Sequence, residues 1–379
     1  MGMRVSCLQD NLARGLSTVG RAVGTRSTLP ILSNVLLMTD NGRLRLSATN
    51  LDMGITAWIG ASVEEDGGLT VPARTLSDLI NTLSPERVDL EVSVRTYALH
   101  LNCGSTTAKI KGIDSEEFPI IPEPGENDDW LSIPADVLRE TISMVAFSAA
   151  RDDSRPILTG VLLNYEGGLI TMAAADGFRL AVREVPIETE YYDSFSLVVP
   201  AKTLTELSRI SPDDDEIIDL VLPKDKSQIL FHMSNVDISS QLIDGVFPDY
   251  RQIIPTETGT RTVLDTADFL RACKRADIFA RESNHTVRMS MEPQDGTIGV
   301  VRVSATSSET GENEVVLDAT IDGPAMEIAF NVRYLIEMLS AIPQERVMLG
   351  TTRTDKPGVL KPVGDTSLTY VIMPMHIGR

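Results

Sequence analysis

Hydrophobic and polar positions along the chain follow one pattern that occurs three times. Apolar residues recur at helical spacing in the segments 8–26, 134–148 and 265–281, which predicts an amphipathic helix near the start of each third of the chain. Short β-prone runs follow each helix, and a turn-forming dipeptide separates two of them each time. The three dipeptides are Asn41-Gly42, Gly167-Gly168 and Asp295-Gly296. Each third therefore predicts a helix followed by a β-hairpin.

A second helix is predicted in each third, over 72–83, 200–210 and 330–340. Val71-Pro72-Ala73 and Val199-Pro200-Ala201 lead into the first two, because proline near the first turn supplies a helical φ without the loss of a hydrogen bond. Further strands follow each of these helices. Each third thus predicts two helices and about eight short strands, which places the chain in the α+β class, with helices packed against antiparallel sheets.

Sequence motifs return in the same phase as these elements. Thr28–Leu32 returns as Arg155–Leu158, Val71–Leu76 returns as Val199–Leu204 and more faintly as Phe330–Leu335, and Phe118–Pro122 returns as Phe247–Pro255. The period is about one third of the 379 residues. Solenoid repeats are roughly 20–50 residues long, so the period indicates three similar domains.

Two segments have the composition of linkers between these domains. The segment 114–129 contains seven acidic residues, no basic residue and three prolines, and the segment 247–261 is rich in proline and threonine. Such stretches are typical of domain boundaries. The predicted domains are residues 1–124, 125–255 and 256–379.

Charge is distributed unevenly along the sequence. The chain has a net charge of −20, which argues against a simple basic nucleic-acid binder. The six predicted helices with their flanks nevertheless hold 12 Lys and Arg against 9 Asp and Glu. An acidic protein with mildly basic helices can carry a cationic surface, although basic residues are also common in helices because they are good helix formers.

One basic position repeats in each predicted helix. Arg14, Arg139 and Arg271 share a place in the first helix of the three repeats, and Arg74, Lys202 and Arg333 share a place near the start of the second. If the domains are arranged around a pseudo-symmetry axis, these side chains form a ring of positive charge. Such a ring suits the phosphate backbone of a nucleic acid.

Other functional classes lack their sequence signals. Cys7, Cys103 and Cys273 lie far apart and are odd in number, so we expect reduced and mostly buried thiols, and the four histidines have no metal-site spacing, so no metal or cofactor is predicted. The apolar runs are too short to span a membrane. The N-terminal sequence does not have the pattern of a signal peptide, and a cytoplasmic location is therefore expected.

These motifs together resemble a known family over essentially the whole chain. The Thr-Leu-Pro-Ile-Leu motif, the two Val-Pro-Ala entries, the Ala-Asp-Gly-Phe-Arg-Leu hairpin within 173–180, Phe-Pro-Asp-Tyr-Arg-Gln-Ile-Ile-Pro at 247–255 and Tyr-Val-Ile-Met-Pro-Met at 370–375 are similar to the bacterial DNA polymerase III β subunits, the sliding clamps. The resemblance implies the DNA clamp fold, with a head-to-tail homodimer that forms a ring around duplex DNA without regard to its sequence. It also implies a non-catalytic processivity subunit. The implied partners are the replicative polymerase, a clamp-loader ATPase, and repair polymerases and ligase, all bound through short peptides.

The resemblance assigns residues to three surfaces. Arg26, Arg74 and Lys202 match positions that face DNA in the family. A cleft for partner peptides is assigned to Arg155, Leu158, Ala175, Gly177, Phe178, Arg179, Leu180, Pro248, Gln252, Ile253, Ile372, Met373, Pro374, Met375 and His376. The dimer contact is assigned to Ala108 and Ile110 on an edge strand and to Ile278 and Phe279 at the end of a helix.

Four of these residues depart from the family pattern. Ala175, Phe178, Gln252 and His376 stand where the family usually has threonine, histidine and two arginines. The peptide cleft is therefore expected to be less polar than in typical members, and to depend more on apolar anchors of the peptide.

Parts of the sequence are also compatible with two other functions. Asp176 with Arg179, Asp152-Asp153 with Arg155, or Asp213-Asp214-Asp215 could in principle serve a hydrolytic enzyme, but Asp-Gly is also a common turn dipeptide and no phosphate loop or nucleophile motif accompanies them. A β-rich protein built from repeats for interaction outside DNA replication is the other alternative. A secreted adhesin of this kind should have a secretion signal.

Overall fold

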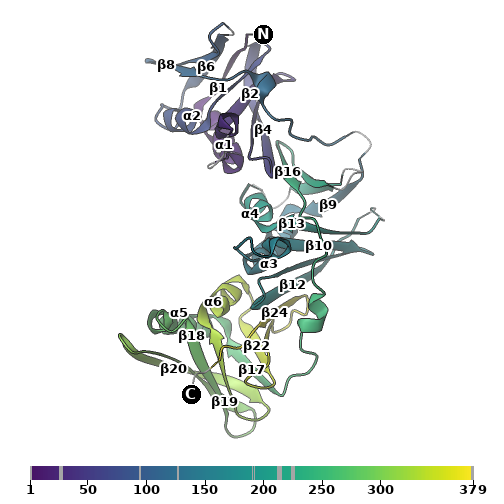
Figure 1. Cartoon of the computed structure of the whole chain (residues 1–379), viewed down its shortest axis with the longest axis vertical. Coiled ribbons are helices and arrows are strands. Elements are labelled where there is room, and N and C mark those ends of the chain that lie inside the picture. Colours follow the sequence, from purple (N-terminus) through teal and green to yellow (C-terminus); the bar gives the residue numbers. More distant parts are fainter. Residues whose placement is uncertain are drawn as a thin grey trace. The chain divides into compact units, whose positions relative to one another are not determined.

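The computed structural model describes residues 2–24, 29–93, 95–125, 128–189, 191, 193–210, 216–222 and 227–376. Arg26, part of the Thr28–Leu32 motif and Asp213–Asp215 lie outside these residues. The chain forms two compact units. Unit 1 comprises residues 1–137 and 206–242, and unit 2 comprises 138–205 and 243–379 (Figure 1).

The threefold repetition is confirmed in the order of the elements. In the described part of the chain, each third contains eight strands and two α-helices. The first third holds β1 (Arg4–Leu8), α1 (Gln9–Val19), β2 (Asn34–Asp40), β3 (Arg43–Thr49), β4 (Met53–Glu65), β5 (Gly68–Pro72), α2 (Ala73–Ile80), β6 (Arg87–Ser93), β7 (Ala98–Cys103) and β8 (Thr106–Lys111).

The other two thirds repeat this order. The second holds β9 (Trp130–Pro134), α3 (Ala135–Val145), β10 (Gly160–Glu166), β11 (Leu169–Ala175), β12 (Arg179–Pro186), β13 (Phe195–Pro200), α4 (Ala201–Ile210), β14 (Ile217–Val221), β15 (Gln228–His232) and β16 (Val236–Gln241). The third holds β17 (Thr260–Asp265), α5 (Thr266–Ala280), β18 (Thr286–Pro293), β19 (Ile298–Ser307), β20 (Gly311–Asp322), β21 (Met326–Asn331), α6 (Val332–Ala341), β22 (Arg346–Thr351), β23 (Gly358–Pro362) and β24 (Leu368–Ile372).

The predicted hairpin turns are also confirmed. Asn41-Gly42 joins β2 to β3, and the corresponding turns join β10 to β11 and β18 to β19. Both residues of the first turn have positive φ, 48° at Asn41 and 75° at Gly42. Asparagine and glycine tolerate this conformation, and the turn type matches the twist of the two strands.

The first helix ends where its helical apolar pattern (Leu8, Leu12, Leu16 and Val19) ends, inside the segment 8–26. α1 ends at Val19, a 3-10 turn covers Gly20–Ala22, and Val23 has an extended backbone. Glycine at position 20 disfavours a longer helix because it loses more backbone freedom than other residues when it becomes helical.

Among the described residues, each unit contains one twelve-stranded sheet. The path through the sheet of unit 1 runs β8-β7-β6-β1-β4-β16-β15-β14-β9, with β2, β3 and β5 attached to β4 through β3. The sheet of unit 2 runs β13-β10-β11-β12-β24-β23-β22-β17-β20-β19-β18-β21. The middle third therefore divides its strands between the two sheets, since β16 pairs with β4 and β12 pairs with β24. The domain boundaries at 124 and 255 stay predictions.

The helices pack on these sheets through their apolar faces. α1 contacts α2 and β4 in unit 1, and α5 contacts α6, β19 and β20 in unit 2. Residues on one side of α5 are buried, among them Phe269, Cys273 and Ala276. In the described part of the chain, no helix is both long and apolar enough to cross a membrane.

We predict that the cysteines of the folded protein do not react with thiol reagents. Cys7 and Cys273 are 6% and 0% exposed, and burial raises the pKa of the Cys7 thiol to about 12 and raises that of Cys273 as well. The thiolate is the reactive form. At pH 8, iodoacetamide should therefore label neither Cys7 nor Cys273 in the native protein, whereas it should label all three cysteines in guanidinium chloride. Native labelling of Cys273 at the rate of free cysteine would contradict this packing.

Candidate functional site

The repeated basic residues stand at matching places on the helices. Arg74, Lys202 and Arg333 are each the second residue of their helix, α2, α4 and α6. All three are exposed. The Arg74 side chain is 95% exposed, and its Nε lies 3.7 Å from Asp78 Oδ2, a surface ion pair of small energetic value. Arg333 Nε lies 3.9 Å from Asp277 Oδ1, and all three side chains are exposed enough to reach a ligand such as a phosphate.

The basic residues of the first helices are less uniform. Arg14 is exposed on α1, where it donates to Asn11 Oδ1 at 2.6 Å, and Arg139 is half-buried on α3. Arg271 is exposed on α5 and pairs with Asp268. Lys274 and Arg275 are exposed on the same side of α5, three and four residues after Arg271. The sequence interpretation missed these two, although their helical spacing from Arg271 was a usable signal.

The residues assigned to the peptide surface are built around a buried arginine in unit 2. The Arg179 side chain is 4% exposed. Its Nε donates to Asp176 Oδ2 at 3.0 Å, its Nη2 donates to the carbonyl of Phe147 at 2.6 Å, and its Nη1 pairs with Glu337 of α6. The guanidinium also lies over the rings of Phe147 and Tyr334. Arg179 is thus fully used inside the protein and supports the surface instead of contacting a ligand.

The Asp176-Gly177 dipeptide forms the turn between β11 and β12. Asp176 Oδ1 accepts hydrogen bonds from the backbone N–H groups of Phe178 and Arg179 at 2.9 and 3.0 Å. Gly177 has a φ of 92°, and a Cβ there would lie 2.5 Å from Arg155 Nη1. Arg155 in turn donates from Nη2 to the Asp176 carbonyl at 2.7 Å. These contacts give Asp176 a structural role at the turn and fix Arg155 beside it.

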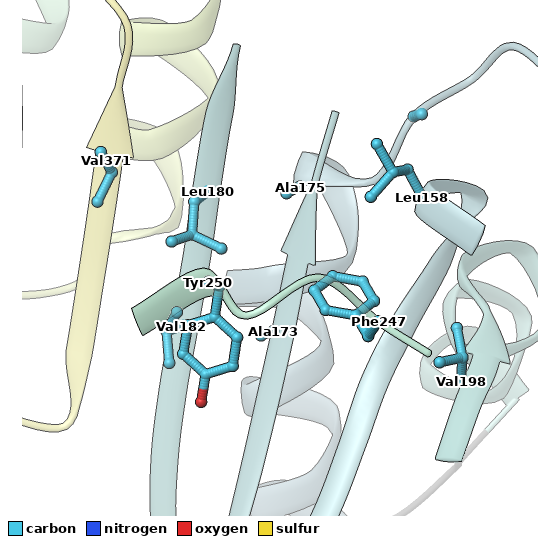
Figure 2. Packing of buried hydrophobic residues seen from close by; sticks show 10 residues of the cluster. Leu158, Ala173, Ala175, Leu180, Val182, Val198, Phe247, Tyr250 and Val371 are labelled. Atoms are coloured by element: carbon cyan, nitrogen blue, oxygen red, sulfur yellow. The ribbon is translucent and has the colours of Figure 1, made fainter. Parts of the chain in front are cut away.

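An apolar cluster lies beside this turn. Leu158, Ala175 and Leu180 pack with Phe247, Tyr250 and Val371. In Figure 2, Leu180 lies on the strand beside that of Val371, above the segment that carries Phe247 and Tyr250. Leu180 is 1% exposed and Ile372 is 0% exposed. These two residues belong to the core of unit 2, and their place on a ligand-contacting surface is not supported by their burial.

Three large apolar side chains of the assigned surface are exposed. Phe178 is 58% exposed, Ile253 is 42% exposed and Met373 is 37% exposed. The N–H of Met373 donates to the Phe178 carbonyl at 2.8 Å, which holds these two residues together. The N–H of Met375 donates to Ala329 of β21, also at 2.8 Å. An exposed apolar patch on a rigid base is typical of an interaction site.

The remaining assigned residues flank these side chains. Pro248 and Gln252 are exposed in and beside the 3-10 turn Tyr250–Ile253, where Gln252 Nε2 donates to Asp249 Oδ2 at 2.9 Å. Pro374 is half-buried and His376 is exposed. Phe178 is the most exposed large apolar side chain of the assigned surface, and a cleft less polar than in typical members stays a prediction.

The residues assigned to the dimer contact lie on β8 and α5. Ala108 is half-buried and Ile110 is 7% exposed. β8 pairs only with β7 among the described strands, so its outer edge is unpaired. Ile278 is 56% exposed at the end of α5, and Phe279 is half-buried. A large exposed isoleucine and a free strand edge are both features that a partner chain can cover.

Comparisons with known proteins agree over the full chain. Family models of the DNA polymerase III β subunit match three consecutive segments: the N-terminal domain at residues 3–122, the central domain at 132–249 and the C-terminal domain at 251–376. A protein of Synechococcus elongatus named "Beta sliding clamp" is 33% identical, and the match covers 99% of this chain and 100% of that protein. The "Beta sliding clamp" of Bacillus subtilis is 28% identical with the same coverage.

Solved structures give the same result. The DNA polymerase sliding clamp of Bacillus subtilis superposes with a TM-score of 0.94 at 28% identity, with both chains fully covered. The DNA polymerase III β subunit of Pseudomonas aeruginosa has a TM-score of 0.90 at 28% identity, with 99% of this chain covered. Since the three matched segments take up nearly all of its residues and carry the repeated helices and strands described above, this chain belongs to the DNA polymerase III β subunit family, the non-catalytic sliding clamps of DNA replication.

Proposed function

We propose that two copies of this chain close head-to-tail into a ring around duplex DNA, and that the exposed apolar patch of unit 2 tethers partner proteins to it. The observation that carries this proposal is a pair of free strand edges with opposite charge. Identical chains close a ring when each contributes two different surfaces and the rotation returns to its start. β8 and β20 supply two such surfaces.

The two edges match in charge. β8 exposes Lys109 and Lys111 and contains no acidic residue. β20 exposes Glu312, Glu314 and Asp318 and contains no basic residue. Between residues 311 and 319, β20 pairs with β19 on one side and with no described strand on the other. Opposite charges on adjoining strands favour pairing and align the two chains.

The two edges also match in their apolar faces. Ala108 and Ile110 share one face of β8, while Lys109 and Lys111 share the other. On β20 the half-buried Val315 and Leu317 alternate with the exposed Glu314, Val316 and Asp318, and α5 packs against this strand. Pairing β8 with β20 would place Ala108 and Ile110 in line with the face that α5 covers. Ile278 and Phe279 at the end of α5 would then close over them.

We predict that charge reversal on either edge breaks the dimer and that reversal on both restores it. Lys109→Glu with Lys111→Glu places like charges opposite each other, and so does Glu312→Lys with Glu314→Lys on the other edge. Each double variant should sediment as a monomer at micromolar concentration, whereas the two together in one chain should recover the dimer. Ile278→Asp with Phe279→Asp should also give monomers.

The matched control for this series is Arg87→Glu with Lys361→Glu, an equal charge change away from both edges, which should leave the dimer intact. The interface would lie elsewhere if the dimer survived each of three changes: the two lysine substitutions on β8, the two glutamate substitutions on β20, and Ile278→Asp with Phe279→Asp.

The basic helix residues support weak contact with the DNA backbone. Arg14, Arg74, Lys202 and Arg271 are exposed and have the charge that phosphates need. Arg139 is half-buried and Arg26 lies outside the described residues, so their contribution rests on the repeat and on the family resemblance. With a net charge of −20, we expect retention on DNA to come from encirclement instead of affinity.

We predict that Arg74→Ala with Lys202→Ala lowers the salt dependence of direct binding to a short duplex. Each lost phosphate contact should reduce the slope of log K against log salt by about 0.9, which fluorescence anisotropy can measure. Arg87→Ala with Arg353→Ala, outside the helices, is the control.

Protein loaded on a nicked circle of DNA should stay bound at a salt concentration that abolishes direct binding, and linearisation of the circle should release it. Retention that survives linearisation would count against encirclement.

The apolar patch supports binding of short peptides from several partners. Met373 and Met375 have flexible, polarizable side chains, which adapt to different ligands, and apolar anchors carry most of the affinity of such contacts. We infer that the replicative polymerase, the clamp-loader ATPase, and repair polymerases and ligase use this patch. We also propose that the protein is located in the cytoplasm.

We predict that Met373→Ala and Met375→Ala each weaken the binding of a polymerase-derived pentapeptide by roughly 1–3 kcal/mol, which is the usual effect of losing an interface anchor. Leu169→Ala is the control, because Leu169 is 37% exposed on β11 outside the patch. Isothermal titration calorimetry checks both. Equal affinity of both methionine variants and the wild type, with the dimer intact, would mean that the peptide binds elsewhere.

A further inference from the structure

Two strand pairs, which we term seams, join consecutive repeats within the units. In unit 1, β16 of the second repeat pairs antiparallel with β4 of the first, and Ile238 lies opposite Ile55. In unit 2, β24 of the third repeat pairs antiparallel with β12 of the second, and Tyr370 lies opposite Ala181. Ile55 and Ala181 are equivalent, because each pairs within its own hairpin with the penultimate residue of the preceding strand, β3 or β11.

Hydrogen bonds confirm that the two seams have the same register. In unit 1, three residues beyond the pair just named, the N–H of Gln241 donates to the Asp52 carbonyl at 2.8 Å. In unit 2, at the same distance along the strands, the N–H of Met373 donates to the Phe178 carbonyl, also at 2.8 Å. The chain therefore joins one repeat to the next twice with the same residue-to-residue alignment. A contact between β8 of one copy and β20 of another would be a third seam of this kind.

The strand β8 corresponds to β16. Both strands have six residues, and Gly112-Ile113-Asp114 follows the first where Leu242-Ile243-Asp244 follows the second. Ala108 and Ile238 are each the third residue of their strand. In a contact between copies, Ala108 therefore takes the place that Ile238 has in unit 1.

The strand β20 corresponds to β4. Arg45–Thr49 of β3 has the sequence Arg-Leu-Ser-Ala-Thr, and Arg302–Thr306 of β19 has the sequence Arg-Val-Ser-Ala-Thr. The alanine of the first motif lies opposite Ile55, and the alanine of the second lies opposite Asn313. Asn313 is thus the equivalent of Ile55.

Pairing with the first strand of each repeat gives the same alignment. Val5 of β1 and Thr262 of β17 each lie four residues before the start of the following helix. Their partners in β4 and β20 lie eight residues after Ile55 and Asn313, respectively. Two independent strand pairings therefore agree on the equivalence of Ile55 and Asn313.

We propose that Asn313 faces Ala108 of a second copy and fixes the register of the contact between the two chains. This alignment rests on the head-to-tail contact proposed above. Within that contact it places Lys109 opposite Glu312, and it places Ile110 opposite Gly311.

Asn313 differs in chemistry from the residues at the same place in the two internal seams. Ile55 and Ala181 are apolar and fully buried. Asn313 is half-buried in the single chain, and its Oδ1 atom is buried without a hydrogen-bond partner among the described residues. A polar residue in an otherwise apolar row costs stability, and it disfavours alignments that cover it with a large apolar side chain.

Charge alone does not select the proposed alignment. A shift by two residues in one direction would place Lys109 opposite Glu314. It would also place Lys111 opposite Glu312, so both lysines would meet a carboxylate. A shift by two in the other direction would leave both lysines opposite uncharged residues, and a shift by one would turn the apolar face of β8 to the solvent. Only the first of these shifts needs a further feature that opposes it.

The amide of Asn313 is that feature. The first shift would place Ile110 over Asn313 and would cover an unpaired polar group with an apolar side chain. In the proposed alignment Asn313 meets the small Ala108, and Ile110 meets Gly311. Large residues then lie opposite small ones, and the amide keeps the space that it needs.

Cross-linking between engineered cysteines measures the alignment. Thr106 lies opposite Val315 in the proposed alignment and opposite Leu317 after the first shift. The variants are Thr106→Cys with Val315→Cys and Thr106→Cys with Leu317→Cys, both with Cys103→Ser, because Cys103 lies opposite Thr106 in the β7–β8 hairpin. Opposite residues of antiparallel strands have Cα atoms about 4.5–5.5 Å apart, which suits a disulfide.

In a glutathione redox buffer, the variant with Val315→Cys should form a disulfide-linked dimer on a non-reducing gel. The variant with Leu317→Cys should form about tenfold less, the factor expected when an unpaired amide is covered. Sedimentation of the wild type separates this alignment from the ring itself. Stronger cross-linking through Leu317→Cys, or none through either pair in a protein that sediments as a dimer, would overturn the alignment and leave the ring proposal standing. A monomeric wild type would overturn both.

Substitutions of Asn313 connect the alignment to its amide. Asn313→Ile copies the first repeat, and Asn313→Ala removes the amide without added bulk. Either change should raise cross-linking through Leu317→Cys close to the level reached through Val315→Cys. Asn313→Gln keeps an amide and is the matched control, so it should leave the ratio of the two products as it is in the parent variants. The same ratio with isoleucine, alanine and glutamine at this position, in proteins that remain dimeric, would overturn the role of Asn313.

Discussion

Unpaired backbone groups at the edges of two sheets are the constraint on which this account of the protein depends. A long strand edge with free N–H and C=O groups invites pairing with another chain, and proteins normally cover, shorten or charge such edges. Here β8 carries lysines and β20 carries carboxylates. Two copies of the same edge therefore repel each other, whereas β8 of one chain and β20 of another attract each other. In the ring that we propose, the same charges that prevent random aggregation select one head-to-tail contact between the two chains, and a closed ring of identical chains requires such a contact.

Within unit 2, the buried guanidinium of Arg179 supports the exposed apolar patch. This one side chain joins the Asp176 turn, the carbonyl of Phe147 and the Glu337 carboxylate of α6. A buried charge is tolerated only when it is paired and hydrogen-bonded, and here those partners come from both the second and the third repeat. The exposed Phe178 and Met373 therefore stand on a base that the two repeats build together.

The sequence predicted those features that depend on local physical chemistry. Asn41-Gly42 predicted a tight turn, and the Val-Pro-Ala motifs predicted the starts of two helices. The repeat predicted that Arg74 and Lys202 occupy the same position of their helices. It did not predict that the middle third divides its strands between two sheets, because the pairing of β16 with β4 and of β12 with β24 joins residues more than a hundred positions apart. It also could not tell that Arg179 and Ile372 are buried while Phe178 is exposed, since burial depends on what the other repeats pack against them.

The central claim is that two chains form a closed ring, and electron microscopy of the purified wild-type protein tests it most directly. Class averages should display a closed particle of two subunits with a central hole wide enough for duplex DNA. The variant with Lys109→Glu and Lys111→Glu should give single open arcs under the same conditions. Wild-type dimers without a central hole would contradict the account.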